Sequence, residues 1–233
     1  MREPKYYLRQ VLKKMIPKYF TGGVLIDIGA GRMKYKPLLK GIPASYIAVD
    51  NGSSPYQFSR KADKSPNLHV LADAHALPFQ NESADAIICT QVIEHVARPW
   101  QIFSEISRIL KPGSIAMVSS AWLFAYHPEP RDYFRYSRHA YASFAQEYKL
   151  TLCETIPLGG LCSAILAVIT RAVTVKFPRI EKLLQHQPFS FMYRLLELIT
   201  EQMDGLWKSE DCIGHLVILK KGSGGSQLPK YPC

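Results

Sequence analysis

Two closely spaced glycines, Gly29 and Gly31, follow the apolar run 24–26 and the acidic residue Asp27. A strand that stops at such glycines lets backbone N–H groups approach a ligand, because no Cβ atom stands in the way. The turn therefore predicts a cradle for a nucleotide-type ligand at the carboxyl edge of a parallel sheet. The alternative is an ordinary turn after a strand that holds no ligand.

The residues on either side of the turn separate two classes of cofactor. Dinucleotide-binding proteins place a third small residue after the second glycine, where it seats the helix on the strand, but this chain has Met33 and Lys34 there. The carboxylate of Asp27 instead suits a cationic group, such as the ammonium group of an amino acid. The turn therefore favours S-adenosylmethionine over NAD.

Polar side chains also stand at the ends of three further apolar runs. Asp50 lies about twenty residues past the glycines, where a carboxylate accepts hydrogen bonds from both hydroxyls of a ribose. Asp73 can accept a hydrogen bond from an adenine amino group, and Gln91 and His95 follow the fourth run. Because the carboxyl ends of parallel strands meet at one edge of a sheet, these side chains predict a single ligand crevice.

The order and spacing of five segments resemble the class I S-adenosylmethionine-dependent methyltransferases of the UbiE-like type, over roughly residues 20–150. These segments are VLIDIGAGR (24–32), YIAVD (46–50), LADAHALPF (71–79), ADAIICTQVIEHV (84–96) and EISRILKPGSIAMVSSAW (105–122). The resemblance implies an α/β fold, in which a Rossmann-like, mainly parallel sheet of seven strands has helices on both faces and an antiparallel last strand.

The resemblance also implies the residues that hold S-adenosylmethionine and its product S-adenosylhomocysteine. They are Asp27, Gly29, Ala30 and Gly31 for the methionine part, Asp50 with Asn51 for the ribose, Asp73 with Ala74 for the adenine, and Gln91 near the methionine carboxylate or the reacting methyl group.

A loop rich in charged and aromatic residues, HPEPRDYFRYS (127–137), follows the predicted fifth strand. Because a loop that leaves this edge must pass over the reactive methyl group, we expect Arg131, Tyr133 and Arg135 to bind the acceptor, with the guanidinium groups holding a phosphate or carboxylate. The loop resembles one in a bacterial subset of the family associated with cell-surface polysaccharide or lipid-linked sugar metabolism. The alternative is a structural knot of ion pairs and aromatic rings.

Two histidines are candidates for the proton acceptor that an oxygen or carbon nucleophile requires near pH 7. His127 opens the loop, and His95 follows the fourth strand. We expect one or both to be catalytic; for His95, a structural role at a helix end or carbonyl is an equal alternative.

The chain divides into a basic amphipathic helix over residues 1–20, an α/β domain over 21–221 with a helical insertion at about 158–206, and a flexible tail over 222–233. Strands are expected near 23–28, 45–50, 67–71, 84–89, 114–119, 150–156 and 214–220. Helices are expected at 99–109 and 137–148, with two further helices in the insertion and a turn at Pro112–Gly113.

Composition narrows the class of protein. The length of 233 residues and a hydrophobic fraction of 47% suit one domain with a core on both faces of a sheet. The five cysteines form neither a CxxC pair nor a zinc-ligand spacing, so we expect reduced thiols and no metal. No signal segment opens the sequence, which predicts a cytoplasmic protein, either free or peripheral at the inner membrane face.

The formal net charge of +10 has several interpretations. The basic N-terminal helix is a cap on the domain, a lid over the substrate site or a contact with anionic lipid. The apolar helices of the insertion are buried, or they form a dimer interface, a roof over a lipid-like acceptor or a membrane-facing patch. A nucleic-acid partner is disfavoured, because no run of basic and aromatic residues forms a recognisable RNA-binding module.

The predicted function is methyl transfer from S-adenosylmethionine to an oxygen or carbon atom of a small or amphipathic acceptor, such as a sugar or a lipid-linked intermediate. The alternatives are an RNA methyltransferase and a protein that binds S-adenosylmethionine without catalysis.

Overall fold

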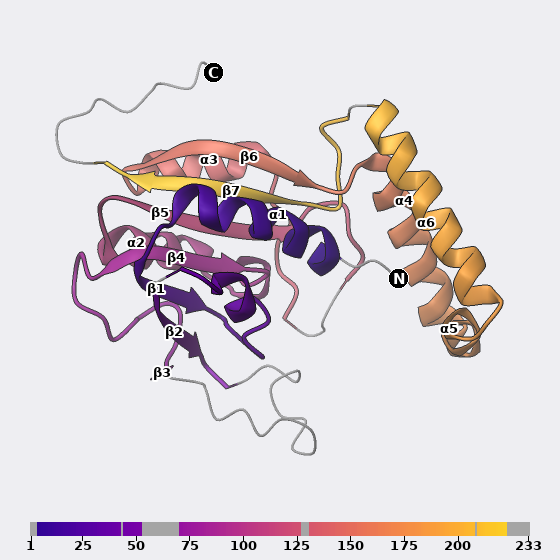
Figure 1. The fold of residues 1–233 in the computed structure, drawn as a ribbon, viewed down its shortest axis with the longest axis horizontal. Coiled ribbons are helices and arrows are strands. Elements are labelled where there is room, and N and C mark those ends of the chain that lie inside the picture. The colour runs from indigo at the N-terminus through magenta and orange to yellow at the C-terminus, as the bar shows by residue number, and fades with distance from the viewer. Residues whose placement is uncertain (1–3, 43, 53–69, 127–130, 208, 223–233) are drawn as a thin grey trace.

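The computed structural model describes residues 4–42, 44–52, 70–126, 131–207 and 209–222. Seven strands form one sheet in the order β3-β2-β1-β4-β5-β7-β6 (Figure 1). Every neighbouring pair is parallel except the two pairs that β7 makes, with β5 and with β6. The predicted α/β fold with an antiparallel last strand is therefore confirmed. The strands are β1 (Gly23–Ile28), β2 (Ala44–Asp50), β3 (Val70–Leu71), β4 (Ala84–Thr90), β5 (Leu110–Ala121), β6 (Leu150–Leu158) and β7 (Gly214–Lys221).

Helices cover both faces of this sheet. Among the described residues they are α1 (Pro4–Tyr19), α2 (Pro99–Ile109), α3 (Arg138–Glu147), α4 (Leu161–Lys176), α5 (Pro178–Gln185) and α6 (Phe189–Leu206), with short 3₁₀ helices at Lys36–Leu39 and Ile93–His95. The helix predicted at 99–109 has these bounds in the structure. Three helices, rather than the expected two, fill the region between β6 and β7.

Two hydrophobic cores lie on opposite faces of the sheet, because alternate residues of each strand point to opposite sides. On one face α1 places Leu8, Leu12 and Ile16, all fully buried, against strand residues such as Leu25. On the other face α2 and α3 pack against residues such as Ile26. The N-terminal helix is thus a cap on the sheet, the first of the three arrangements considered from the sequence.

The parallel register brings the carboxyl ends of the strands to one edge. Ile28 at the end of β1 pairs with Val49 of β2 and with Cys89 of β4. Thr90, at the end of β4, pairs with Ser119 of β5. The turns that follow these strands therefore open on the same space.

Most of the strands end within two residues of their predicted bounds, but β5 differs more. β5 begins at Leu110 rather than at residue 114, so Pro112 and Gly113 lie within the strand instead of forming a turn before it. Gly113 has φ +81°, and the pairing with β4 shifts register between Ala84 and Ala86; the ladder absorbs the irregularity as a bulge does. β3 is described only at Val70–Leu71, because residues 67–69 of the prediction lie outside the described residues.

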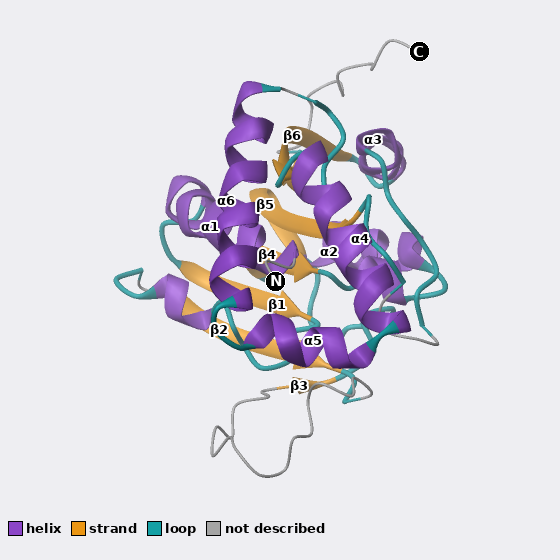
Figure 2. Ribbon diagram, turned by 90° about the vertical axis from the view of Figure 1, so that its right-hand side faces the viewer, coloured by secondary structure: helices purple, strands orange, loops and turns teal. Residues whose placement is uncertain are grey.

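Helices α4, α5 and α6 form a separate layer beside the sheet (Figures 1 and 2). Ala164 and Ala167 of α4 join Ile213 in a small core, against which Leu123 and Phe124 pack. In the described part of the chain, no single helix has the length and hydropathy needed to cross a membrane. The pair α4 and Pro178–Leu184 passes the same test only when taken together, across a bend of 116°.

A carboxylate of α6 holds the first turn of α4 within this layer. Asp204 accepts hydrogen bonds from the backbone N–H groups of Gly160, Cys162 and Ser163 at 3.0, 2.7 and 3.2 Å. These donors belong to the first turn of α4, where backbone N–H groups have no partner within the helix. Asp204 therefore caps a helix that is more than forty residues away in the sequence.

We expect Asp204→Ala to destabilise α4 by about 1–3 kcal/mol, because three N–H groups lose a charged acceptor. Hydrogen exchange of the α4 amides measures this local loss. Asp204→Asn keeps one oxygen acceptor and should have an intermediate effect, and Gln202→Ala, on an exposed position of the same helix, should have none. Unchanged α4 exchange in Asp204→Ala would contradict the capping role.

Candidate functional site

A cavity of about 350 Å³ opens at the carboxyl edge of the sheet. The turns after β1, β2, β3 and β4 and the segment that begins at residue 131 surround it. The residues that line it are Ile28, Gly29, Gly31, Val49, Asp50, Asn51, Ala72, Asp73, Ala74, His75, Gln91, Val92, His95, Val96, Ala97, Arg131 and Tyr133. Four strand ends thus contribute to one site.

The turn after β1 approaches its neighbours too closely for a side chain at Gly29. A Cβ atom at Gly29 would lie 2.3 Å from Cγ2 of Val92, and the φ of +70° is unfavourable for other residues. The N–H groups of Gly29 and Ala30 donate to the carbonyl of Val49 at 2.8 and 3.0 Å. The backbone of β2 therefore holds the turn in place.

Asp50, at the end of β2, is connected to the same turn. Its Oδ2 accepts a hydrogen bond from the N–H of Gly31 at 3.0 Å, and its Oδ1 accepts one from the N–H of Gly52 at 3.1 Å. A carboxylate oxygen has two lone pairs, so each oxygen keeps the capacity to accept one more donor from the cavity. This is the arrangement that a pair of ribose hydroxyls requires.

The turn after β3 contributes Asp73, Ala74 and a histidine that sequence reasoning missed. Asp73 Oδ1 accepts a hydrogen bond from the N–H of His75 at 2.9 Å and lies 2.6 Å from its Nδ1. These contacts lower the pKa of Asp73, the backbone hydrogen bond most. The Nε2 atom of His75 is buried without a hydrogen-bond partner among the described residues. An unpaired buried nitrogen at the cavity points to a polar ligand group there.

Gln91 begins the turn after β4 in a left-handed backbone conformation, with φ +55°. Its N–H donates to the carbonyl of Ser119 at 2.8 Å, and its side-chain Nε2 donates to Ser119 Oγ at 3.3 Å. Both contacts come from β5, so the fourth and fifth strands together orient the amide of Gln91 at the cavity.

Asp27 and Ala30 are absent from the described residues that line the cavity. Asp27 is buried and accepts a hydrogen bond from the hydroxyl of Tyr46 at 2.5 Å. Burial raises the pKa of Asp27 to about 7, the hydrogen bond from Tyr46 lowers it in part, and the charge of Asp50 raises it further. The contact of Asp27 with a ligand ammonium group stays a prediction, and in this structure its carboxylate hydrogen-bonds to Tyr46.

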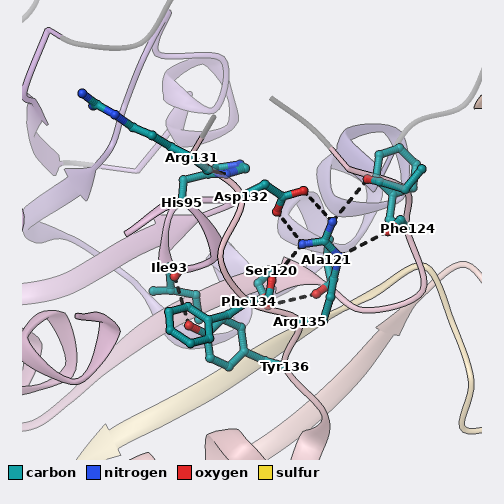
Figure 3. A network of polar contacts seen from close by, with 11 residues as sticks. Ile93, His95, Ser120, Ala121, Phe124, Arg131, Asp132, Phe134, Arg135 and Tyr136 are labelled. Carbon is teal, nitrogen blue, oxygen red and sulfur yellow. Dashed lines mark hydrogen bonds and ion pairs between the residues drawn. The ribbon is translucent and has the colours of Figure 1, made fainter. Parts of the chain in front are cut away.

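His95 and two residues of the predicted acceptor loop also line the cavity. His95 Nδ1 lies 2.7 Å from the carbonyl oxygen of Arg131, and the N–H of Tyr133 donates to the carbonyl of Glu94 at 2.8 Å. The side chain of Arg131 extends away from Asp132 and Arg135 (Figure 3). His95, Arg131 and Tyr133 thus line the cavity together, whereas His127 lies outside the described residues.

Arg135 does not take the position expected of a substrate-binding residue. It lies outside the described cavity lining, and its guanidinium makes a bidentate pair with Asp132 at 2.5 and 2.7 Å. It also donates to the carbonyls of Phe124 at 3.2 Å and Ala125 at 3.3 Å (Figure 3). For Arg135, the structure agrees with the alternative of a structural ion pair. The guanidinium donors of Arg135 join the chain after β5 to residues 132–135.

Glu94 is a second residue that sequence reasoning did not assign. Its side chain is fully buried, and neither carboxyl oxygen has a hydrogen-bond partner of good geometry among the described residues. Burial raises the pKa of Glu94 to about 8, although nearby N–H groups and the charge of Arg135 favour the ionised form. An acidic residue in an apolar motif, VIEHV, was the only signal in the sequence.

We expect Glu94→Gln to remove a pH dependence of stability. The unfolded chain releases the Glu94 proton near pH 4.5, and the folded chain retains it to about pH 8. The free energy of unfolding therefore falls as the pH rises through this window. As the pH rises from 4.5 to 8, the free energy of unfolding of the Gln variant should therefore increase by roughly 2–4 kcal/mol relative to that of the wild type.

Urea denaturation at pH 5 and pH 8 measures this difference. The control Glu147→Gln replaces an exposed carboxyl of α3 and should follow the wild type at both values. Parallel pH profiles for the wild type and Glu94→Gln would show that the Glu94 carboxyl titrates normally.

Comparisons with known proteins agree with this geometry. Residues 26–118, which run from β1 into β5, match the model of a methyltransferase domain family. An uncharacterised methyltransferase of Mycobacterium marinum is 30% identical over 132 residues, which are 55% of this chain and 52% of that protein. The chain thus spans about half the length of this curated relative.

Solved structures share the fold at low sequence identity. The [4+2]-cyclase SpnF has a TM-score of 0.60 and 17% identity, over 92% of this chain and 82% of its own. Phosphoethanolamine N-methyltransferase 2 of Haemonchus contortus, in complex with S-adenosyl-L-methionine, has a TM-score of 0.57 and 15% identity, over 93% of this chain and 53% of its own. The same enzyme is also known with phosphomonomethylethanolamine and S-adenosylhomocysteine, at a TM-score of 0.58.

The family match covers the glycine turn and all four strand ends that surround the cavity. S-adenosylmethionine is the cofactor that this family uses. Residues 26–118 of this chain therefore match the methyltransferase domain family, in agreement with the resemblance to S-adenosylmethionine-dependent methyltransferases that the sequence motifs carry.

Proposed function

We propose that this chain transfers a methyl group from S-adenosylmethionine to an oxygen or carbon atom of a small or amphipathic acceptor that carries an anionic group. The observation that carries the proposal is the shared cavity at the carboxyl edge. Residues suited to a nucleoside line it together with His95, Arg131 and Tyr133.

The residues around the cavity fit the cofactor. Asp50 has free acceptor capacity for two ribose hydroxyls, and the glycine turn offers backbone at a point where a Cβ atom at Gly29 would collide with Val92. The unpaired Nε2 of His75, beside Asp73, suits the adenine ring. In this proposal Asn51, Ala74 and Gln91 complete the site, while Asp27 supports the turn from below.

The chemistry depends on alignment more than on activation. The sulfonium of the cofactor supplies an activated methyl group, so the protein must hold the nucleophile in line with it and exclude water. Residues from the turns after β1 to β4 fix the donor. The segment 131–136, held in place by the bidentate pair of Arg135 and Asp132, then fixes the acceptor.

Arg131 is the residue proposed to hold the anionic part of the acceptor. A guanidinium group binds phosphate and carboxylate through two parallel hydrogen bonds, and Arg131 faces the cavity rather than the ion pair beside it. The Haemonchus enzyme was solved in complex with phosphomonomethylethanolamine, whose name includes a phosphate. A sugar phosphate or a lipid-linked phosphate satisfies the same chemistry.

His95 is the described candidate for proton removal. If its Nδ1 donates to the carbonyl of Arg131, the neutral ring has Nε2 as an acceptor for a proton. The same hydrogen bond couples the position of the base to the position of the acceptor-binding residue. His127 remains a second candidate base on sequence grounds.

The alternatives differ in class and in what they predict. RNA methylation requires a continuous basic surface beside the cavity. A protein that binds the cofactor without transferring its methyl group requires only the nucleoside side of the site. The cyclase SpnF shares this fold, so the fold alone does not decide between methyl transfer and another use of the cavity.

We expect S-adenosylmethionine and S-adenosylhomocysteine to bind with micromolar affinity, and Asp50→Ala to weaken both about 100-fold. The reason is the loss of two charge-assisted hydrogen bonds to the ribose. Titration calorimetry measures the dissociation constants, with NAD as the competing dinucleotide. Asp211→Ala removes an exposed carboxylate and should leave binding unchanged. A preference for NAD, or no binding of the sulfur compounds, would refute the cofactor assignment.

We expect Arg131→Ala to raise KM for a phosphate-bearing acceptor by roughly 10- to 100-fold while leaving S-adenosylmethionine affinity unchanged. Transfer of a labelled methyl group, in a screen that begins with lipid-linked sugars, provides the assay. Arg131→Lys should restore part of the loss, because lysine keeps the positive charge but cannot form the two parallel hydrogen bonds of a guanidinium group. An equal loss of cofactor affinity would move Arg131 to the nucleoside side of the site.

A further inference from the structure

The helical layer of α4, α5 and α6 carries most of the exposed apolar surface of the protein. Of the 23 large apolar side chains that are exposed in the described residues, 17 lie between residues 165 and 207. The most exposed include Phe191 at 64%, Met192 at 62% and Val175 at 62%. We name this surface the outer helical face. Its extent exceeds the scattered apolar residues of an ordinary protein surface.

The inner sides of the same helices are polar or small. The buried residues of α4 are Ser163, Ala164, Ala167, Thr170 and Thr174, and those of α6 are Glu197 and Thr200. Hydrogen bonds join these inner sides: the hydroxyls of Thr170 and Tyr193 lie 3.1 Å apart, and Tyr7 donates to Ser163 Oγ at 3.1 Å. Helices α4 and α6 therefore bury small residues and residues with polar side chains, while most of their large apolar side chains are exposed.

This pattern is the reverse of a helix that packs on a core in water. Such a helix buries its apolar stripe and exposes its charged face, as α1 does with Leu8, Leu12 and Ile16. Small and hydroxyl residues between helices, with apolar residues outside, are typical of helices in contact with lipid. The outer helical face thus has the composition of a surface that is covered by acyl chains.

Charge indicates which apolar partner fits. Residues 161–207 contain five basic residues, Arg171, Lys176, Arg179, Lys182 and Arg194, and four acidic residues, Glu181, Glu197, Glu201 and Asp204. Of these acidic residues, Glu197 is buried, and Glu201 and Asp204 are half-buried. Lys176, Arg179, Lys182 and Arg194 are exposed among the apolar side chains. A second copy of the chain would bring like charges together, whereas an anionic lipid surface attracts them.

We propose that the outer helical face lies in the interfacial region of a bilayer that contains anionic lipids. The apolar side chains enter the boundary between head groups and acyl chains, and the basic residues contact the lipid phosphates. The small core of this layer includes Phe124, whose carbonyl accepts a hydrogen bond from Arg135. Membrane contact would thus place the segment 131–135, which Arg135 joins to Phe124, beside the lipid surface. The proposal does not depend on the methylation chemistry.

The test is flotation of the full chain with vesicles of phosphatidylcholine, with and without 30% phosphatidylglycerol. We expect binding to the anionic vesicles that weakens as salt is raised, because each basic residue near the surface contributes about five-fold. The variant Phe191→Ser/Leu195→Ser/Ile199→Ser removes three exposed apolar side chains of α6 and should lower partitioning at least ~30-fold. Its melting temperature and S-adenosylmethionine affinity should match those of the wild type.

Trp100→Ser serves as the matched control, because it removes an exposed aromatic residue of α2 (41% exposed) outside the helical layer. This variant should bind vesicles like the wild type. Two results would overturn the proposal: equal vesicle binding by the triple variant and the wild type, or no vesicle binding by the wild type. A wild-type dimer that the triple variant converts to a monomer, without vesicle binding, would assign the face to a second copy.

Discussion

The arrangement of the site depends on the close approach of the turn after β1 to its two neighbouring strands. The N–H groups of Gly29 and Ala30 bond to the carbonyl of Val49, and a Cβ atom at Gly29 would overlap Val92. Only glycine allows this approach, and the approach brings the N–H of Gly31 within 3.0 Å of Asp50. The nucleoside side of the cavity is thus a consequence of parallel strand register combined with one position that tolerates no side chain.

The acceptor side is held by a different kind of interaction. Arg135 and Asp132 form a bidentate pair whose remaining donors bond the chain after β5. Beside them lies the buried carboxyl of Glu94, whose backbone carbonyl fixes Tyr133. This partly buried ion pair orders the segments, because removing Arg135 would leave the nearly inaccessible carboxylate of Asp132 without its charged partner. The ion pair thus lies outside the described cavity lining and connects the segment that contains Arg131 and Tyr133 to the chain after β5.

The helical layer between β6 and β7 follows separate rules from the sheet. Its helices hold one another through Asp204, Thr170 and Tyr193, while their apolar residues face outward. Hydrogen bonds and small residues, rather than apolar burial, thus supply the specificity of helix pairing in this layer. The strand ends thus form the cavity, the ion pair orders the segment that begins at residue 131, and the helical layer carries the exposed apolar side chains.

The sequence by itself determined the class of fold and several of the polar residues that line the cavity. Apolar periodicity and glycine turns depend on residues close together in the chain. The bounds of α2 and the polar residues at the ends of β1 to β4 could therefore be predicted from the sequence alone. Only the tertiary structure decided that Arg131 faces the cavity while Arg135 is used in an ion pair, that Glu94 is buried, and that α4 and α6 turn their apolar sides outward. Those outcomes depend on contacts between residues far apart in the chain, such as Arg135 with Phe124 and Asp204 with Cys162, which no local pattern encodes.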